Sequence, residues 1–178
     1  MSDVTSRVSE RAAELRREFD RAFAEPFHVE TTIKQVLLGI GVAGQRYAIR
    51  LSEAGGVHAD KKITPVPGSS PVLRGIAGFR GALLPVYDLH VLLGRTTDDA
   101  PRWLVVAAAA PVAFTFTAFE GQLRASADEI LPRTANSDQQ IYAREILRTR
   151  AFTGPILHLP SVLEAIKALG TEALRSKE

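Results

Sequence analysis

Two stretches of the chain repeat each other, and this repeat constrains the fold more than any other feature. FRGALLPVYDLHVLL, residues 79–93, and FTGPILHLPSVLEAI, residues 152–166, match at a constant offset of 73 residues. The matched positions include Phe79 and Phe152, Gly81 and Gly154, and the possible helix caps Asp88 and Ser161. Each copy has the pattern of strand, turn, strand and capped helix. We therefore predict two similar small β units packed together, with chance similarity as the alternative.

The other strand signals also predict a mainly β protein. Alternating apolar residues indicate strands near residues 34–42, 45–51, 102–110, 112–119, 122–125 and 145–152. The glycine pair at 55–56 and the proline-bounded stretch 65–71 are typical of loops. A helix is expected over residues 161–169, after Pro160. Roughly ten short strands separated by turn signals fit paired small barrels better than a sandwich.

An amphipathic helix is expected before the β units, over residues 6–24. One helical face carries Val8, Ala12, Leu15, Phe19 and Phe23, and Pro26 ends the pattern. This apolar stripe has to be covered, and we expect it to dock on its own chain rather than on a second copy or a partner. We predict a helical extension over residues 1–30, a β domain over 31–170 and a tail over 171–178. Within that domain the first barrel spans about 34–94 and the second about 101–160, with strand exchange between them allowed.

Composition argues against several classes of protein. The 178 residues carry 22 Lys and Arg against 20 Asp and Glu, so the net charge of +2 gives no basic patch for nucleic acid. The absence of cysteine excludes disulfides and thiolate metal sites and fits a reducing compartment. No signal-peptide pattern is present, and the longest apolar run contains Pro111. We expect a cytoplasmic protein.

Motifs for catalysis or cofactor binding are weak or missing. The GxGxxG pattern of residues 39–44 is followed by QRYAIRL, which alternates like a strand, whereas a dinucleotide site needs a helix there. We interpret these glycines as part of a hairpin turn. The four histidines lack the spacing of metal ligands. We expect no enzyme activity, no cofactor and no metal.

Arg80 is the residue that the fold requires least. It lies between Phe79 and Gly81 in an apolar stretch, at a short turn signal, and it is expected to point into solvent. Thr153 occupies the corresponding position of the second copy, which indicates that the turn forms without arginine. We therefore predict that Arg80 contacts a partner. Leu84, Val86 and Leu89 are the expected core residues of the same segment.

The stretch VLRGIAGFRGALLPVYDL, residues 72–89, resembles the signature of CheW-like domains. The resemblance extends over about residues 34–169 and is most specific from Arg80-Gly81 to Asp88-Leu89. It implies two small five-stranded, SH3-like barrels packed on a shared core. It also implies a non-catalytic adaptor of a bacterial chemosensory system, which couples the chemoreceptor cytoplasmic tip to the regulatory domain of a CheA-type histidine kinase. Other CheW-like proteins are further candidate partners.

The resemblance also assigns roles to individual residues. The candidate partner-binding residues are Arg80, Phe79, Gly81, Gly78 and Val57. Asp88 and Gly154 are expected to form structural turns or caps. Three positions depart from the family pattern: Gly78 replaces an asparagine, Gly56 lies near a frequent glutamate and Thr117 near an aspartate. The alternatives are a divergent paralogue that competes with the ordinary adaptor without activating the kinase and, more remotely, a small-barrel nucleic-acid binder.

Overall fold

The fold is known from a computed structural model, which describes residues 34–67, 70–133 and 142–175 of the chain. The helix expected over residues 6–24, and with it the whole extension over 1–30, lies outside the described residues. The described part is mainly β, as the sequence predicts, and its strands form two sheets.

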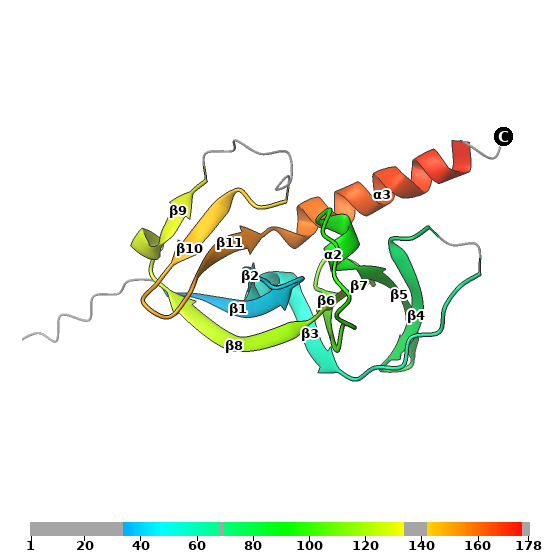
Figure 1. The fold of residues 1–178 in the computed structure, drawn as a ribbon, viewed down its shortest axis with the longest axis horizontal. Coiled ribbons are helices and arrows are strands. Elements are labelled where there is room, and N and C mark those ends of the chain that lie inside the picture. The colour runs from blue at the N-terminus through cyan, green and yellow to red at the C-terminus, as the bar shows by residue number, and fades with distance from the viewer. Residues whose placement is uncertain (1–33, 68–69, 134–141, 176–178) are drawn as a thin grey trace, which may run out of the picture. The chain divides into compact units, whose positions relative to one another are not determined.

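Sheet A has six strands in the order β8-β1-β2-β11-β10-β9, and sheet B has five in the order β3-β6-β7-β5-β4. The strands of sheet A are β1 (Gln35–Val42), β2 (Gln45–Arg50), β8 (Ala118–Ala125), β9 (Ile130–Pro132), β10 (Glu145–Arg148) and β11 (Thr153–Leu157). Those of sheet B are β3 (Ala54–Ala59), β4 (Leu73–Phe79), β5 (Ala82–Asp88), β6 (Trp103–Ala107) and β7 (Ala113–Phe116). The helical segments are η1 (Leu51–Glu53), α2 (Leu89–Leu92), η2 (Ala127–Glu129) and α3 (Leu159–Arg175). Figure 1 shows the two curved sheets next to each other, with α2 beside α3.

The two sheets share one topology, which explains the repeat in the sequence. In sheet B the hairpin β6–β7 lies between β3 and the hairpin β4–β5, and β7 pairs in parallel with β5. In sheet A the hairpin β1–β2 lies between β8 and the hairpin β10–β11, and β2 pairs in parallel with β11. Each of these second hairpins is followed by a helix. The repeat therefore corresponds to the units β4–β5–α2 and β10–β11–α3.

The expected division into barrels at about 34–94 and 101–160 is wrong. Strands β1 and β2 belong to sheet A with β8 to β11, whereas β3 to β5 join β6 and β7 in sheet B. The strand exchange that the prediction allowed is therefore present in this chain. The exchange consists of the parallel pairs β2–β11 and β5–β7 and the antiparallel pairs β1–β8 and β3–β6, each of which joins strands from the two expected barrels.

Buried residues of the described part form three apolar clusters. The largest joins β1, β2, β6, β7 and β11 to both α helices, so it is a core shared by the two sheets. A second cluster lies within sheet A and a third within sheet B. The expected core residues are confirmed: Leu84 and Val86 belong to the sheet B cluster, and Leu89 belongs to the shared core.

The glycine-rich stretch of residues 39–44 forms a strand and a hairpin turn, as expected. Gly39 and Gly41 lie in β1, and the turn consists of Ala43 and Gly44, both with positive φ. A Cβ atom at Gly41 would lie 3.0 Å from the Cβ of Ala118, so this glycine lets β8 pack closely on β1. The loop expected at residues 55–56 is wrong, because both glycines lie within β3, where the register with β6 shifts. Glycine in a strand often marks such an irregularity.

Helix α3 begins earlier and ends later than expected. It starts at Leu159, so Ser161 lies inside the helix and is not its cap. The backbone amide of Leu159 donates a 2.8 Å hydrogen bond to Oε2 of Glu53, a residue of η1. A cap supplied from 106 positions away has no local sequence signature. The helix continues to Arg175, into the segment expected to be a tail. No helix in the described ranges has the length and apolarity needed to cross a membrane.

Candidate functional site

The tip of the β4–β5 hairpin is a two-residue turn with an unusual side chain. Arg80 has φ +46° and Gly81 has φ +85°, so both central residues lie in the left-handed region. Such turns favour Asn-Gly, Asp-Gly or Gly-Gly, because other residues pay a conformational cost there. Arg80 is exposed and has no hydrogen bond or ion pair among the residues that the structure describes. A large cation is therefore held in solvent at a position where the backbone would favour a smaller residue.

Leu83 is the second exposed residue of this hairpin. Its exposed fraction of 72% is the largest of any large apolar residue in the described chain. It pairs with Gly78 across the two strands, and a Cβ at Gly78 would have no atom within 4 Å. Gly78 thus leaves Leu83 without a side-chain neighbour on the opposite strand. We define Gly78, Arg80, Gly81 and Leu83 as the hairpin tip.

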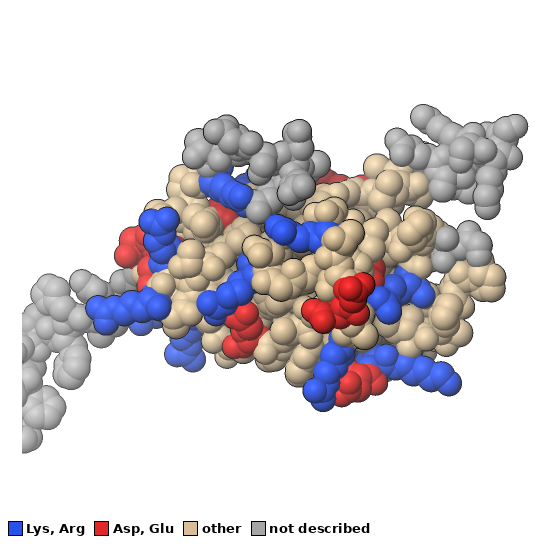
Figure 2. Space-filling view, in the orientation of Figure 1, with Lys and Arg blue, Asp and Glu red and all other residues tan. Residues whose placement is uncertain are grey.

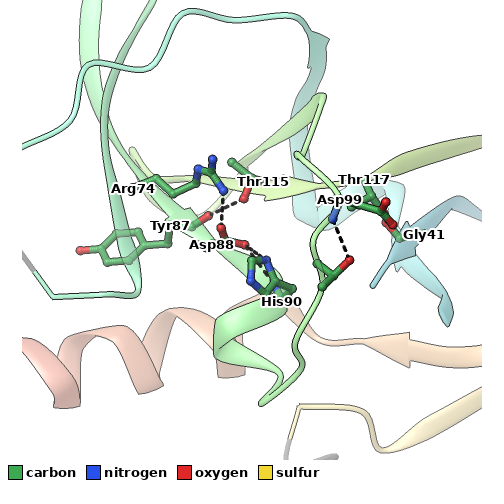
Figure 3. Close-up of polar contacts among 9 residues, drawn as sticks. Gly41, Arg74, Tyr87, Asp88, His90, Asp99, Thr115 and Thr117 are labelled. Carbon is green, nitrogen blue, oxygen red and sulfur yellow. Dashed lines mark hydrogen bonds and ion pairs between the residues drawn. The ribbon is translucent and has the colours of Figure 1, made fainter. Parts of the chain in front are cut away.

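The base of the hairpin is held by a buried carboxylate. Asp88 is only 3% exposed, and its Oδ2 accepts a 2.7 Å hydrogen bond from the Arg74 guanidinium. Its Oδ1 lies 2.5 Å from Nδ1 of His90 and accepts from the His90 amide at 3.3 Å, which makes Asp88 the N-cap of α2. Figure 3 shows Asp88 between Arg74 and His90. These contacts tie the start of β4 to the end of β5 and to α2.

A second constraint on β4 comes from the chain that precedes it. Thr64 and Ile76 exchange two backbone hydrogen bonds of 2.8 and 2.9 Å. Gly75 lies directly beside this contact, and a Cβ there would lie 2.1 Å from the carbonyl oxygen of Thr64. Any side chain at position 75 would therefore displace the strand. Arg74, Gly75 and Asp88 are the structural half of the signature stretch, and the hairpin tip is its exposed half.

Phe79 is 6% exposed and belongs to the apolar cluster inside sheet B, so it contributes little exposed surface to the partner contact predicted for it. Two polar side chains contact its ring from the outside. The His58 ring is edge-on to it with centroids 5.0 Å apart, and Nζ of Lys61 lies 5.4 Å from the ring centroid. Phe79 thus connects the core of sheet B with a small basic surface.

His58 carries the one perturbed imidazole in this region. Desolvation by burial lowers the pKa of His58 most, and the positive charges of Lys61 and Arg80 lower it further. Both effects disfavour the imidazolium form. The contact between the His58 and Phe79 rings places the end of β3 beside the turn between β4 and β5.

The remaining expected site residues have structural positions. Val57 is half-buried in β3 and packs against the shared core. Gly154 is wrong as a turn residue, because it lies in β11 opposite Leu147. A Cβ at Gly154 would lie 2.7 Å from the carbonyl oxygen of Arg46, so close packing explains this glycine.

The comparison of Arg80 with Thr153 is also wrong. The turn of the second copy is formed by Thr149 to Phe152, where the Thr149 amide donates to the Phe152 carbonyl at 2.8 Å, and Thr153 is already in β11. The two hairpins therefore differ in turn position although their sequences align. The prediction that Arg80 contacts a partner rests instead on the exposure of its side chain and on its left-handed backbone conformation.

Two of the departures from the family pattern have visible consequences. A Cβ at Gly56 would lie 3.2 Å from Nε2 of His58, so the imidazole lies against the side of position 56 that a larger residue would fill. Thr117 lies between β7 and β8, and both its amide and its hydroxyl donate to the carbonyl of Gly41, at 3.0 and 2.8 Å. Figure 3 includes Thr117 beside Gly41. Thr117 fixes the chain where it passes from sheet B to sheet A.

Sequence reasoning missed Leu83, His58 and Lys61. Strand alternation could have identified Leu83, because Leu84 and Val86 face the core and their neighbours must face outward. No local pattern brings His58 or Lys61 to the hairpin, since His58 lies in β3 and Lys61 follows that strand. Within the described ranges, no group of three or more His, Asp or Glu side chains is placed to hold a metal ion.

Comparison with known proteins agrees with this architecture. The model of the CheW-like domain family matches residues 36–167. Among solved structures, the scaffolding protein TtCheW from Thermoanaerobacter tengcongensis matches with a TM-score of 0.64 and 17% identity, over 70% of this chain and 89% of that chain. At this identity the likeness shows the fold alone. No curated protein matches the chain. Because the family model covers most of the chain, including the hairpin tip and its buried base, the chain belongs to the CheW-like domain family.

Proposed function

We propose that this protein is a non-catalytic cytoplasmic adaptor of a bacterial chemosensory system. It couples the cytoplasmic tip of a chemoreceptor to the regulatory domain of a CheA-type histidine kinase through protein–protein contacts. The hairpin tip forms the receptor-side contact. Membership of the CheW-like domain family supports the scaffold role.

The observation that carries the proposal is the backbone of Arg80. Left-handed conformations of non-glycine residues cost on the order of 1 kcal/mol, and they concentrate at functional sites. Arg80 adopts one with its side chain in solvent and without a partner among the described residues. The exposed Leu83 adds apolar area next to this charge. Arginine is enriched among the residues that dominate the binding energy of protein–protein contacts.

The test is a binding measurement with a matched control. We expect Arg80→Ala to weaken binding to a receptor cytoplasmic fragment about tenfold or more, which is the effect of a central interface residue. The control is Arg124→Ala, because Arg124 is an exposed arginine on β8 of sheet A. It should leave the affinity within about twofold. Equal affinities for the wild type and Arg80→Ala would contradict the assigned contact, and no complex with receptor or kinase would contradict the adaptor function.

A second candidate is a paralogue that binds an array component without activating the kinase. Gly56 and Gly78 favour it, because both lack the side chain that the family pattern has there and Gly78 faces open space. A reconstituted kinase assay separates the two functions. An adaptor raises receptor-coupled kinase activity when added to receptor and kinase. A competing paralogue lowers that activity when it is added on top of an ordinary adaptor.

A further inference from the structure

A small basic surface lies where the end of β3 meets the β4–β5 turn. His58 of β3 contacts the Phe79 ring edge-on, and Lys61 lies over the same ring. Arg80 follows Phe79 directly in the chain. Two side chains that carry or can carry a positive charge therefore contact one aromatic ring, and the charge of Arg80 acts on His58 from the adjoining turn. We call His58, Lys61 and Arg80 the basic cluster.

The chain does not neutralise this cluster itself. Neither Lys61 nor Arg80 forms an ion pair with a carboxylate of the described residues. The nearest acidic residue in the sequence, Asp60, is engaged by Arg102, whose Nε lies 3.0 Å from Oδ1. On β6, the residue opposite His58 is the uncharged Leu104. Figure 2 shows blue side chains on either side of a red one at the lower right of the molecule, where β3 and the β4–β5 hairpin end in Figure 1.

The position of His58 depends on the glycine at position 56. Because Gly56 has no side chain, Nε2 of His58 lies only 3.2 Å from where a Cβ would be. A larger residue at position 56 would push against the imidazole. The imidazole lies between Gly56 on its own strand and Phe79 on β4.

We propose that the basic cluster binds a carboxylate side chain of the protein partner and that His58 takes up a proton when it does so. The proposal rests on the adaptor function and names the chemistry of the partner at that site. A carboxylate placed among Lys61, Arg80 and His58 offsets the repulsion between the two fixed cations and the imidazolium. It also accepts a charge-assisted hydrogen bond from the protonated ring.

The coupling between proton uptake by His58 and partner binding has a definite direction. In the free protein the pKa of His58 is lowered by burial, Lys61 and Arg80, so the ring is mostly neutral at pH 7. A bound carboxylate raises this pKa, so the complex holds more protons than its free components. Binding must then tighten as the pH falls and weaken as the pH rises through the pKa of the complex.

The experiment measures the binding of the full chain to a receptor cytoplasmic fragment at pH 8 and pH 6. Titration calorimetry in two buffers of different ionisation enthalpy gives the protons taken up. We expect the wild type to bind at least about threefold more tightly at pH 6 than at pH 8. We also expect the complex to take up a fraction of a proton near pH 7 as it forms. His58→Gln should lose both effects, whereas His158→Gln, a control outside the cluster, should keep them. Lys61→Gln should weaken binding at both pH values.

The outcomes separate this inference from the proposed function. Binding that is independent of pH in the wild type, or that keeps its pH dependence in His58→Gln, overturns the role of the basic cluster but leaves the adaptor function intact. Absence of any complex with receptor or kinase overturns the adaptor function itself. If His58→Gln does not fold, the wild-type proton uptake and the Lys61→Gln variant still decide the question.

Discussion

At the scale of single residues, Arg80 combines an unfavourable backbone conformation with a solvent-exposed charge. Its φ of +46° suits asparagine better than arginine. We expect Arg80→Asn to raise the free energy of unfolding by up to about 1 kcal/mol and to weaken receptor binding. Arg80→Ala, which keeps the same strain, should change stability by less than about 0.5 kcal/mol. Urea denaturation of the two variants tests this, and a large loss of stability in Arg80→Ala would show that the side chain supports the fold.

In contrast to Arg80, Asp88 is buried, and both of its carboxylate oxygens accept hydrogen bonds. Asp88→Ala removes the partner of Arg74 and the cap of α2 together. We expect a loss of about 1–3 kcal/mol in unfolding free energy, measured by denaturant titration. Asp88→Asn, which retains an acceptor for the His90 amide, should lose less. Equal losses in the two variants would mean that the charge of Asp88, and not its cap, carries the whole effect.

The lowered pKa of His58 also leads to a prediction of how the stability of the fold depends on pH. Its pKa is lowered in the folded protein, mainly by burial, so the unfolded chain binds more protons in the window just below pH 6.5. The contribution of His58 to stability is therefore present above that window and is lost as the pH falls through the folded-state pKa. Thermal unfolding at several pH values should show a smaller loss below pH 6.5 in His58→Gln than in the wild type. A protein that becomes more stable on acidification through this residue would contradict the burial of its neutral form.

At the scale of elements, the β4–β5 hairpin separates a structural face from an exposed one. Leu84 is buried in sheet B, while its neighbour Leu83 is exposed. Leu84→Ala should cost about 2–5 kcal/mol through lost burial and a cavity, and Leu83→Ala less than about 0.5 kcal/mol. Chemical denaturation of this adjacent pair tests the strand register. Similar losses in both variants would mean that the hairpin faces are not separated in this way.

The sequence predicts such elements where the signal is local. Strand alternation identifies β1 and β2, the Arg80-Gly81 pair identifies a tight turn, and Asp88 marks the start of α2. It fails where distant segments decide the structure. The start of α3 depends on Glu53, and the basic cluster depends on the approach of β3 to the β4–β5 turn. Gly154 was noticed in the sequence but for the wrong reason, because glycine is required there by packing on Arg46 and not by a turn.

At the scale of the whole molecule, the repeat defines two units that exchange strands between two sheets. The hairpin–helix units were visible in the sequence because each is continuous in the chain. The pairs that make the exchange were not visible, because each joins strands far apart in the sequence, such as β2 with β11 and β3 with β6. The shared core, which contains residues of both sheets and of α2 and α3, makes cooperative unfolding of the two sheets the expected behaviour.

The buried residues of the three apolar clusters in the described chain lie between Leu37 and Ile166. We expect a variant lacking residues 1–26 to remain folded, with a melting temperature close to that of the full chain. The amphipathic pattern of the removed segment predicts a change in partner affinity or in oligomeric state. Circular dichroism and light scattering on the truncated protein test both points. An insoluble product would show that this segment belongs to the core.

The central claim is that the hairpin tip, and not the rest of sheet B or sheet A, contacts the receptor. Backbone amide NMR shifts of the full chain, recorded with and without the receptor cytoplasmic fragment, test it most directly. The account predicts the largest changes at Gly78, Arg80, Gly81 and Leu83, with a further change at His58. Changes confined to sheet A, with the amides of the hairpin tip unaffected, would contradict it.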